Sequence, residues 1–501
     1  MPFAQVFSRA QLGIDAPLVQ VEAHVTGGLP AFTLVGLPET AVRESRDRVR
    51  AAILSSGFEF PPCRLTINLA PADLPKESAR FDLAIALAIL AATEQLNTTS
   101  AERIAEHEFI GELSLDGHIR GVRGCLSAAR ACRDASRILV LPQAGCREAA
   151  LLRDINGFGV CHLREVVGYL LGQAEPEPVE YQPTTPPDPA LAGDLADVRG
   201  QPRAKRALAI AAAGNHNMLL IGPPGAGKSM LAQRLAGILP PMTEDEALAA
   251  AEIATISSCG FEPTQFGLRP FRAPHHSASA VALIGGGSQP GPGEISLAHH
   301  GTLFLDELPE FDRRVLEALR EPLEAGSVTI SRAARQAQFP AQFQLIAAMN
   351  PSPQGTEIQS RAAQRYRARI SGPLLDRIDM HLEIPRVPAA ELDQPTQASD
   401  SSYTIRQQVI GARKTMQQRQ GCPNAQVKTH QVQQLFTLGS SERALLNQAI
   451  ERLNLSGRAR ERIIKIAQTI CDLDQRPAID GQAIGEAVGY RNLDRLFKPA
   501  G

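Results

Sequence analysis

The stretch LLIGPPGAGKSML, residues 219–231, constrains the fold of this 501-residue chain more than any other. An apolar run, typical of a buried strand, leads into a glycine-rich loop, and a helical pattern begins at Lys228 and Ser229. The loop fits the spacing G-x-x-x-x-G-K-[ST], in which small residues let backbone N–H groups close around phosphate oxygens. Strand, loop and helix in this order indicate an α/β domain that binds a nucleotide.

This loop predicts a set of nucleotide contacts. We expect Lys228 to reach the β- and γ-phosphates and the Ser229 hydroxyl to bind Mg²⁺. The predicted binding residues are Gly222, Pro223, Pro224, Gly225, Ala226, Gly227, Lys228, Ser229 and Met230.

Two further motifs follow apolar runs. GTLFLDEL, residues 301–308, ends a strand-like run in two carboxylates, which are costly there unless paired or bound to a metal. We expect Asp306 to hold Mg²⁺ and Glu307 to orient and deprotonate the attacking water. In LIAAMNP, Asn350 could hold that water or the γ-phosphate, although an asparagine before proline is also a common turn residue. The three motifs in this order favour ATP and Mg²⁺ as the cofactors.

Composition excludes several other classes. The net charge of -2 does not indicate a general affinity for nucleic acid, so any DNA contact would need a local patch of basic side chains. The eight cysteines are scattered without CxxC spacing, which argues for reduced thiols and against a disulfide framework or a zinc site. No run is apolar and long enough to span a membrane, and the start lacks a signal peptide pattern. We therefore expect a cytoplasmic protein.

The chain is predicted to be an α/β multidomain protein. Residues 172–193 are rich in proline and acidic side chains and read as a linker. Residues 1–171 before it mix strand and helix patterns. In residues 194–390, strand-like runs alternate with helices, which indicates a parallel sheet covered by helices. Residues 391–501 are mainly helical.

The order of the three motifs resembles that of AAA+ ATPases. Longer strings, among them RPFRAPHHSASAVALIGGG, PGPGEISLAHHGTLFLDELPEF and SGPLLDRIDMHLEIP, resemble the magnesium-chelatase-like ComM (YifB) family. The resemblance extends to GLPETAVRESRDRVRAAILSSGF near the start and so covers nearly the whole chain. It implies a Lon-protease-like amino-terminal domain, an AAA+ core with an insertion in its second helix, and a carboxyl-terminal helical lid.

The resemblance also implies roles for arginines. Arg377, in LLDRID, occupies the position of the finger that reaches the γ-phosphate of a neighbouring subunit. Arg458, in LSGRA, matches the lid arginine that contacts nucleotide in its own subunit. Without the resemblance, an ordinary solvent or ion-pair role would be favoured for both.

Two elements resemble those that face the central channel of a ring: the insertion before GTLFLDEL, and the hairpin SVTISRAARQAQFPAQF, which carries Arg332 and Arg335 near its tip. We expect these two arginines to contact DNA. The histidine pairs at 275–276 and 299–300 are predicted to make structural polar contacts, because adjacent side chains diverge and chelate poorly. Many relatives carry a cysteine cluster after the asparagine, but NPSPQGTEIQSRAAQRY has none, so we expect no zinc there.

The amino-terminal domain departs from a serine-lysine protease. By motif alignment, Arg80 stands at the serine position and Leu126 at the lysine position. We therefore expect a non-proteolytic domain that guides substrate or assembles the ring.

The resemblance implies a homo-hexameric, ATP-driven DNA helicase that promotes branch migration on single-stranded or branched DNA during homologous recombination and natural transformation. The alternative is a MoxR-like or chelatase-like remodeller of a protein partner, without DNA. The arginine-bearing hairpin favours DNA, because a protein-threading motor usually needs an aromatic channel loop.

Overall fold

The computed structural model describes residues 3–36, 40–76, 79–183, 193–258, 260–287, 290–332, 335–352, 360–388, 401–491 and 493. The chain divides into two compact units, one of Met1–Thr185 with Ala251–Phe266 and one of Pro186–Ala250 with Gly267–Gly501. Residues 251–266, which the sequence predicts within the ATPase core, are grouped with the first unit in this division. Among the described helices, none is long and apolar enough to cross a membrane.

The first unit is built on a seven-stranded mixed sheet with the order β3-β4-β2-β1-β5-β8-β9. Alternating burial along β2 and β4 reflects one face that packs on helices. The strands are β1 Phe3–Arg9, β2 Leu18–Thr26, β3 Ala31–Val35, β4 Arg64–Ala70, β5 His107–Phe109, β8 Ile138–Pro142 and β9 Gly157–Val160, with a small pair of β6 Glu112–Leu113 and β7 Ile119–Arg120. The helices are α1 Thr40–Ser55, α2 Asp82–Ala92, α3 Thr98–Glu106, α4 Cys125–Asp134, α5 Cys146–Ala149 and α6 Leu163–Leu170.

Helix α2 forms the centre of the first core. Ten of its eleven residues are buried, as the nearly continuous apolar run predicts. Arg80, just before it, is buried too, and its guanidinium donates to Gln11 Oε1 at 3.1 Å. Leu126 on α4 is fully buried. The positions that would carry a protease serine and lysine are thus filled by a buried cation and a core leucine. Ser78, the serine nearest to this position in the sequence, lies outside the described residues.

The second unit contains a five-stranded parallel sheet with the order β11-β14-β17-β10-β18. Its central strands are buried along their whole length, as their continuous apolar runs predict. The strands are β10 Met218–Ile221, β11 Phe271–Arg272, β14 Thr302–Leu305, β17 Gln344–Met349 and β18 Met380–Glu383. The helices within this part of the chain are α7 Pro202–Gly214, α8 Lys228–Ile238, α12 Arg313–Ala318, α13 Arg320–Ala325, α14 Arg361–Arg367 and α15 Gly372–Leu375. Helix α9, Glu244–Ile256, is divided, because its residues from Ala251 on are grouped with the first unit.

The insertion and the hairpin are both present. The insertion contains α10 Ala280–Ile284, α11 Glu294–Leu297 and the short pair of β12 Gly285–Gly286 and β13 Gly291–Pro292. The hairpin consists of β15 Ser327–Arg332 and β16 Arg335–Pro340, in which Arg332 pairs with Arg335 next to the turn. Ile330 of β15 lies against Gly285, so the two elements pack on each other.

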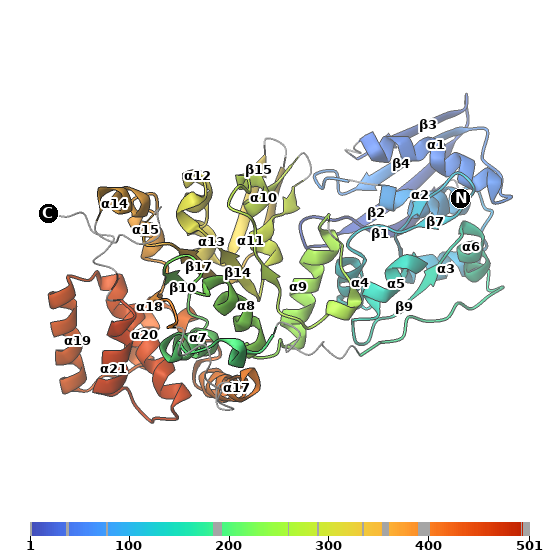
Figure 1. The fold of residues 1–501 in the computed structure, drawn as a ribbon. Coiled ribbons are helices and arrows are strands. Elements are labelled where there is room, and N and C mark those ends of the chain that lie inside the picture. Colours follow the sequence, from blue (N-terminus) through green and yellow to red (C-terminus); the bar gives the residue numbers. More distant parts are fainter. Residues whose placement is uncertain are drawn as a thin grey trace. The chain divides into compact units, whose positions relative to one another are not determined.

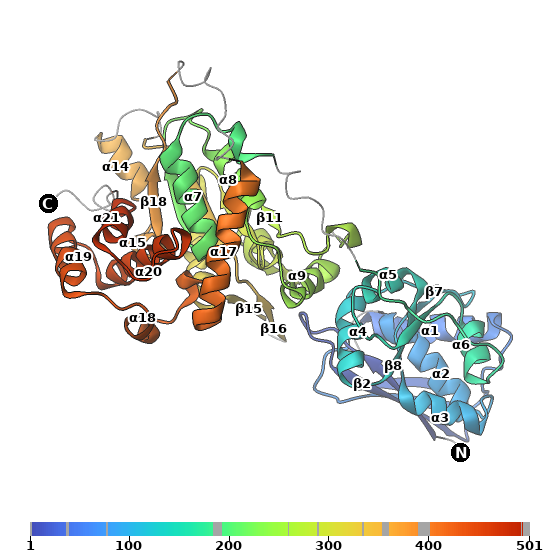
Figure 2. The ribbon, with the colours of Figure 1, turned by 90° about the horizontal axis from the view of Figure 1, so that it is seen from below.

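The carboxyl-terminal helices join the core of the sheet. They are α17 Ser402–Gln420, α18 Thr429–Leu435, α19 Ser440–Leu453, α20 Gly457–Leu473 and α21 Gly481–Gly489. One continuous apolar cluster includes Leu220 on β10, Val409 on α17 and Ile466 on α20. Figure 2 shows α17 running beside α7, which agrees with their contacts. These helices therefore share one core with the parallel sheet.

Candidate nucleotide site

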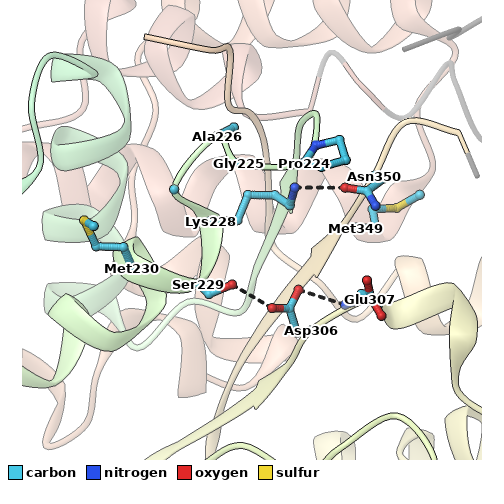
Figure 3. A pocket seen from close by; sticks show the side chains of 11 residues that line it. Pro224, Gly225, Ala226, Lys228, Ser229, Met230, Asp306, Glu307, Met349 and Asn350 are labelled. Carbon is cyan, nitrogen blue, oxygen red and sulfur yellow. Dashed lines mark hydrogen bonds between the residues drawn. The ribbon is translucent and has the colours of Figure 1, made fainter. Parts of the chain in front are cut away.

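The three sequence motifs meet at one edge of the parallel sheet. Strands β10, β14 and β17 are neighbours in register, so the loops that follow them emerge together at the carboxyl edge. These loops enclose a pocket of about 380 Å³ (Figure 3). Its lining residues are Pro224, Gly225, Ala226, Gly227, Lys228, Ser229, Met230, Asp306, Glu307, Met349 and Asn350.

The loop backbone requires its glycines. Gly225 and Gly227 have φ angles of 77° and 87°, in the left-handed region that costs other residues about 1–2 kcal/mol. At Gly222 a Cβ atom would collide with the carbonyl oxygen of Ile384. Gln201 also supports the loop, because its side-chain amide donates to the Ala226 carbonyl at 2.9 Å. The loop that we predict to bind phosphate therefore has a defined backbone conformation, and a side chain from the same unit stabilises it.

Lys228 is buried at the start of α8 and points into the pocket. Its ammonium donates to the carbonyls of Gly222 and Pro223 at 2.7 and 3.0 Å and to Asn350 Oδ1 at 3.0 Å. Burial lowers its pKa, against the opposing effect of the Asp306 and Glu307 carboxylates. Lys228 and Asn350, which are distant in sequence, thus share one hydrogen bond in the pocket.

Ser229 and Asp306 form the best-defined cation site of the pocket. The Ser229 hydroxyl donates to Asp306 Oδ2 at 2.6 Å, as Figure 3 shows. A hydroxyl and a carboxylate at the end of a strand are hard oxygen donors of the kind that Mg²⁺ takes beside phosphates. The donor set therefore fits Mg²⁺.

Glu307 follows Asp306 in a constrained backbone. Its φ is 52°, the left-handed region that is uncommon for residues other than glycine and recurs at functional sites. Its N–H donates to Asp306 Oδ1 at 2.9 Å, which fixes the turn between the two carboxylates. The Glu307 side chain remains half-exposed and borders the pocket, so its carboxylate can reach a water molecule there.

The two predicted arginines are not among the lining residues of this pocket. The Arg377 guanidinium is buried and pairs with Glu324 Oε1 on α13 at 2.5 Å, and it donates to the Pro373 carbonyl at 2.7 Å. Arg458 is exposed in the first turn of α20. For both arginines, the role that the resemblance implies remains a proposal.

Three other predictions concern residues that do not line this pocket. The side chains of Arg332 and Arg335 lie outside the described part of the structure, although their backbones place them at the hairpin tip. Residues 353–359, where we expected no zinc, lie outside it as well. His276 makes a polar contact, with its Nδ1 atom 3.4 Å from Glu307 Oε2. The expectation that adjacent histidine side chains diverge is wrong, because the ring centroids of the two pairs lie only 4.0 and 3.8 Å apart. No signal in the sequence pairs His276 with Glu307, because the pairing depends on the neighbouring strands β11 and β14.

Comparison with known proteins identifies the family. Models described as "Magnesium chelatase, subunit ChlI", "Subunit ChlI of Mg-chelatase" and "Magnesium chelatase, subunit ChlI C-terminal" match residues 194–392, 21–145 and 399–491. The chain is 48% identical to the "Uncharacterized protein YifB" of Escherichia coli, over 99% of this chain and 98% of that protein. It belongs to the magnesium-chelatase-like ComM/YifB family.

Other members extend the comparison over the full length. The "Competence protein ComM" of Haemophilus influenzae is 46% identical, over 99% of both chains. An uncharacterized protein of Mycobacterium tuberculosis strain H37Rv is 40% identical, over 98% of this chain and 99% of its own length. The family assignment agrees with the observed mixed α/β architecture, its parallel sheet and its helical carboxyl terminus.

Proposed function

We propose that the protein is an ATP-driven DNA motor: a cytoplasmic homo-hexamer that promotes branch migration on single-stranded or branched DNA. The observation that carries the ATPase part is the convergence of Lys228, Ser229, Asp306, Glu307 and Asn350 on one pocket at the carboxyl edge of the sheet. Membership in a magnesium-chelatase-like family supports the use of ATP and Mg²⁺.

In this mechanism the loop backbone and Lys228 bind the phosphates. The Lys228 ammonium exchanges its bonds to the Gly222 and Pro223 carbonyls for phosphate oxygens. Ser229 and Asp306 would hold Mg²⁺, which would supply positive charge beside the phosphates. The Asn350 amide, beside Lys228, orients the γ-phosphate or the attacking water.

Hydrolysis then needs a base and extra positive charge. The Glu307 carboxylate accepts a proton from the attacking water. Arg377 supplies charge to the pocket of a neighbouring copy, because each copy holds its own Arg377 outside the lining of its own pocket. Arg458, near the start of α20, contacts nucleotide within its own subunit, as the resemblance implies.

DNA is proposed as the substrate on two grounds. One relative, which is 46% identical over nearly the full length, is named a competence protein. The family resemblance associates such members with natural transformation. The hairpin backbone also places two arginines as the last cross-strand pair before the turn. With a net charge of -2, affinity for DNA must come from such local cations.

The test removes these two cations. Arg332→Ala combined with Arg335→Ala is expected to weaken single-stranded DNA binding and to abolish DNA stimulation of the ATPase, while basal ATPase survives. In a fluorescence anisotropy salt series, the slope of log affinity against log salt should fall by about 1.4, since each lost phosphate contact contributes about 0.7.

A matched control removes two exposed arginines from α19, Arg443→Ala with Arg452→Ala, and should leave both measurements unchanged. Equal binding by the hairpin variant and the wild type would contradict the role of the hairpin. A wild-type protein with no salt-sensitive DNA binding would favour the remodeller of a protein partner.

A further inference from the structure

The side chain of Arg377 is withdrawn into its own subunit. It is only 8% exposed, and the residue lies two positions beyond the end of α15. One terminal nitrogen of the guanidinium lies 2.5 Å from Glu324 Oε1 on α13, and the other donates to the Pro373 carbonyl at 2.7 Å. To bond to a phosphate of another copy, this guanidinium must therefore first leave the Glu324 carboxylate.

The withdrawn position has costs that favour release. The Nε atom of Arg377 is buried and, within the described residues, has no hydrogen-bond partner. A buried N–H group without a partner is unfavourable. Other cations lie close by, because burial lowers the pKa of Arg462 and the charges of Arg491 and Arg377 lower it further. Like charges at close range repel each other, so the carboxylate of Glu324 offsets an otherwise unfavourable position.

Glu324 is placed to give up its partner. Its side chain is 55% exposed, so water can solvate the carboxylate when the guanidinium leaves. A carboxylate and a phosphate accept from the same N–H groups of an arginine. A phosphate of a neighbouring copy can therefore replace the Glu324 carboxylate as the partner of Arg377.

We propose that Glu324 is the positioning residue for Arg377 and holds it in the withdrawn position until it bonds to the γ-phosphate of ATP in a neighbouring copy. This inference rests on the proposed ATPase function and on the role of Arg377 in it. ADP has no γ-phosphate, so with ADP in the neighbouring pocket the guanidinium stays with Glu324. The finger thus engages a neighbour that holds ATP and not one that holds ADP.

The first test needs no nucleotide. The full-length protein is treated with phenylglyoxal, which modifies accessible guanidinium groups, and the modification of Arg377 is followed by peptide mass spectrometry. Glu324→Gln removes the charge but keeps an oxygen acceptor for the same N–H, so Arg377 should react about two- to fivefold faster than in the wild type. Glu321→Gln, at an exposed position on the same helix, is the matched control and should leave the rate unchanged.

The second test measures ATP hydrolysis in mixed rings without DNA. Subunits with Glu307→Gln supply the finger, and subunits with Arg377→Ala supply the intact pocket, so only interfaces between the two kinds are active. Adding Glu324→Gln to the finger donor should raise the recovered activity about two- to fivefold, since the finger is released more easily. Adding it to the pocket donor should change nothing, because that subunit has no finger to release.

These placements separate positioning from a structural role. An equal modification rate of Arg377 in Glu324→Gln and the wild type would overturn the proposal. So would a rise in recovered activity that is absent from the finger donor or equal in both donors. If circular dichroism shows that Glu324→Gln does not fold, Glu324→Asp replaces it: this variant keeps the charge but lengthens the pair, and both readouts should move in the same direction by a smaller factor.

The failure of the proposed function gives a different result. A wild-type protein without ATPase activity would refute that function, while the modification rates would still decide whether Glu324 holds Arg377. Full activity of Arg377→Ala alone would remove the finger and overturn this inference with it. Because neither assay contains DNA, a failure of DNA binding refutes the DNA motor and leaves the role of Glu324 standing.

Discussion

At the scale of single residues, we assign Glu307 to the hydrolysis step and Lys228 to nucleotide binding. Lys228 is buried among loop carbonyls and Asn350, where it can contact phosphates, whereas Glu307 stands at the pocket border with a free carboxylate oxygen. Their substitutions should therefore affect different steps.

Glu307→Gln should bind ATP with wild-type affinity and lower kcat about 10²- to 10⁴-fold, because only the group that accepts the proton is lost. Lys228→Ala should instead lose tight nucleotide binding. The measurements are equilibrium binding of a fluorescent ATP analogue and phosphate release, with Lys414→Ala on the exposed face of α17 as a lysine control. Turnover near wild type in Glu307→Gln would refute the role of Glu307.

Much of the site was predictable from sequence because its signals are local. The phosphate loop, the paired carboxylates and Asn350 each follow an apolar run, and the structure brings all three to one pocket. The contact of His276 with Glu307 and the pairing of Arg377 with Glu324 were not predictable, because each joins segments that only the folded sheet brings together. Sequence patterns likewise predict four of the five strands of the parallel sheet, but they predict neither the short edge strand β11 nor the grouping of residues 251–266 with the first unit.

At the scale of elements, a buried ion pair joins α20 to the start of β18. Asp379 Oδ1 lies 3.2 Å from the Arg462 guanidinium, and Asp379 Oδ2 accepts from the Asn217 N–H at 2.9 Å. Burial raises the pKa of Asp379, but Arg462 and His216 outweigh that effect and hold it below its ordinary value. Because the pKa of Asp379 is lower in the folded state than in the unfolded state, its ionised carboxylate stabilises the fold fully above about pH 3.9, the pKa of an unfolded aspartate. This stabilisation is lost as the pH falls through the pKa of the folded state.

Asp379→Asn should therefore destabilise the second unit by about 3 kcal/mol at neutral pH, because it leaves the largely buried Arg462 guanidinium without its counter-charge. For a unit of about 300 residues, the melting transition followed by circular dichroism should fall by about 5 °C. Glu317→Gln, which breaks the surface pair with Arg320, is the control and should cost less than about 1 kcal/mol. Equal melting temperatures for Asp379→Asn and wild type would contradict the account of this pair.

The segment that carries Arg377 gives a second prediction at this scale. If Arg377 acts on a neighbouring subunit, Arg377→Ala and Glu307→Gln are each inactive alone, but mixed rings contain interfaces with both groups intact. In a one-to-one mixture about one quarter of head-to-tail interfaces should recover, with ATPase activity to match. The measurement is phosphate release before and after subunit exchange. Full activity of Arg377→Ala alone would exclude the finger role.

At the scale of the whole molecule, the central claim is that ATP hydrolysis in the second unit moves DNA. The full-length match to ComM and YifB relatives sets the family, and the hairpin that we propose to contact DNA packs on the insertion. A motor of this kind couples its ATPase to a change in DNA strand pairing, which a protein remodeller does not.

The most direct test incubates the purified wild-type protein with fluorescently labelled forked and mobile four-way DNA and follows strand separation and exchange by native gel electrophoresis. The account predicts that product accumulates with ATP and Mg²⁺ and is absent with a non-hydrolysable analogue, with Glu307→Gln or with Lys228→Ala. Robust ATP hydrolysis without any strand separation or exchange on either substrate would contradict it.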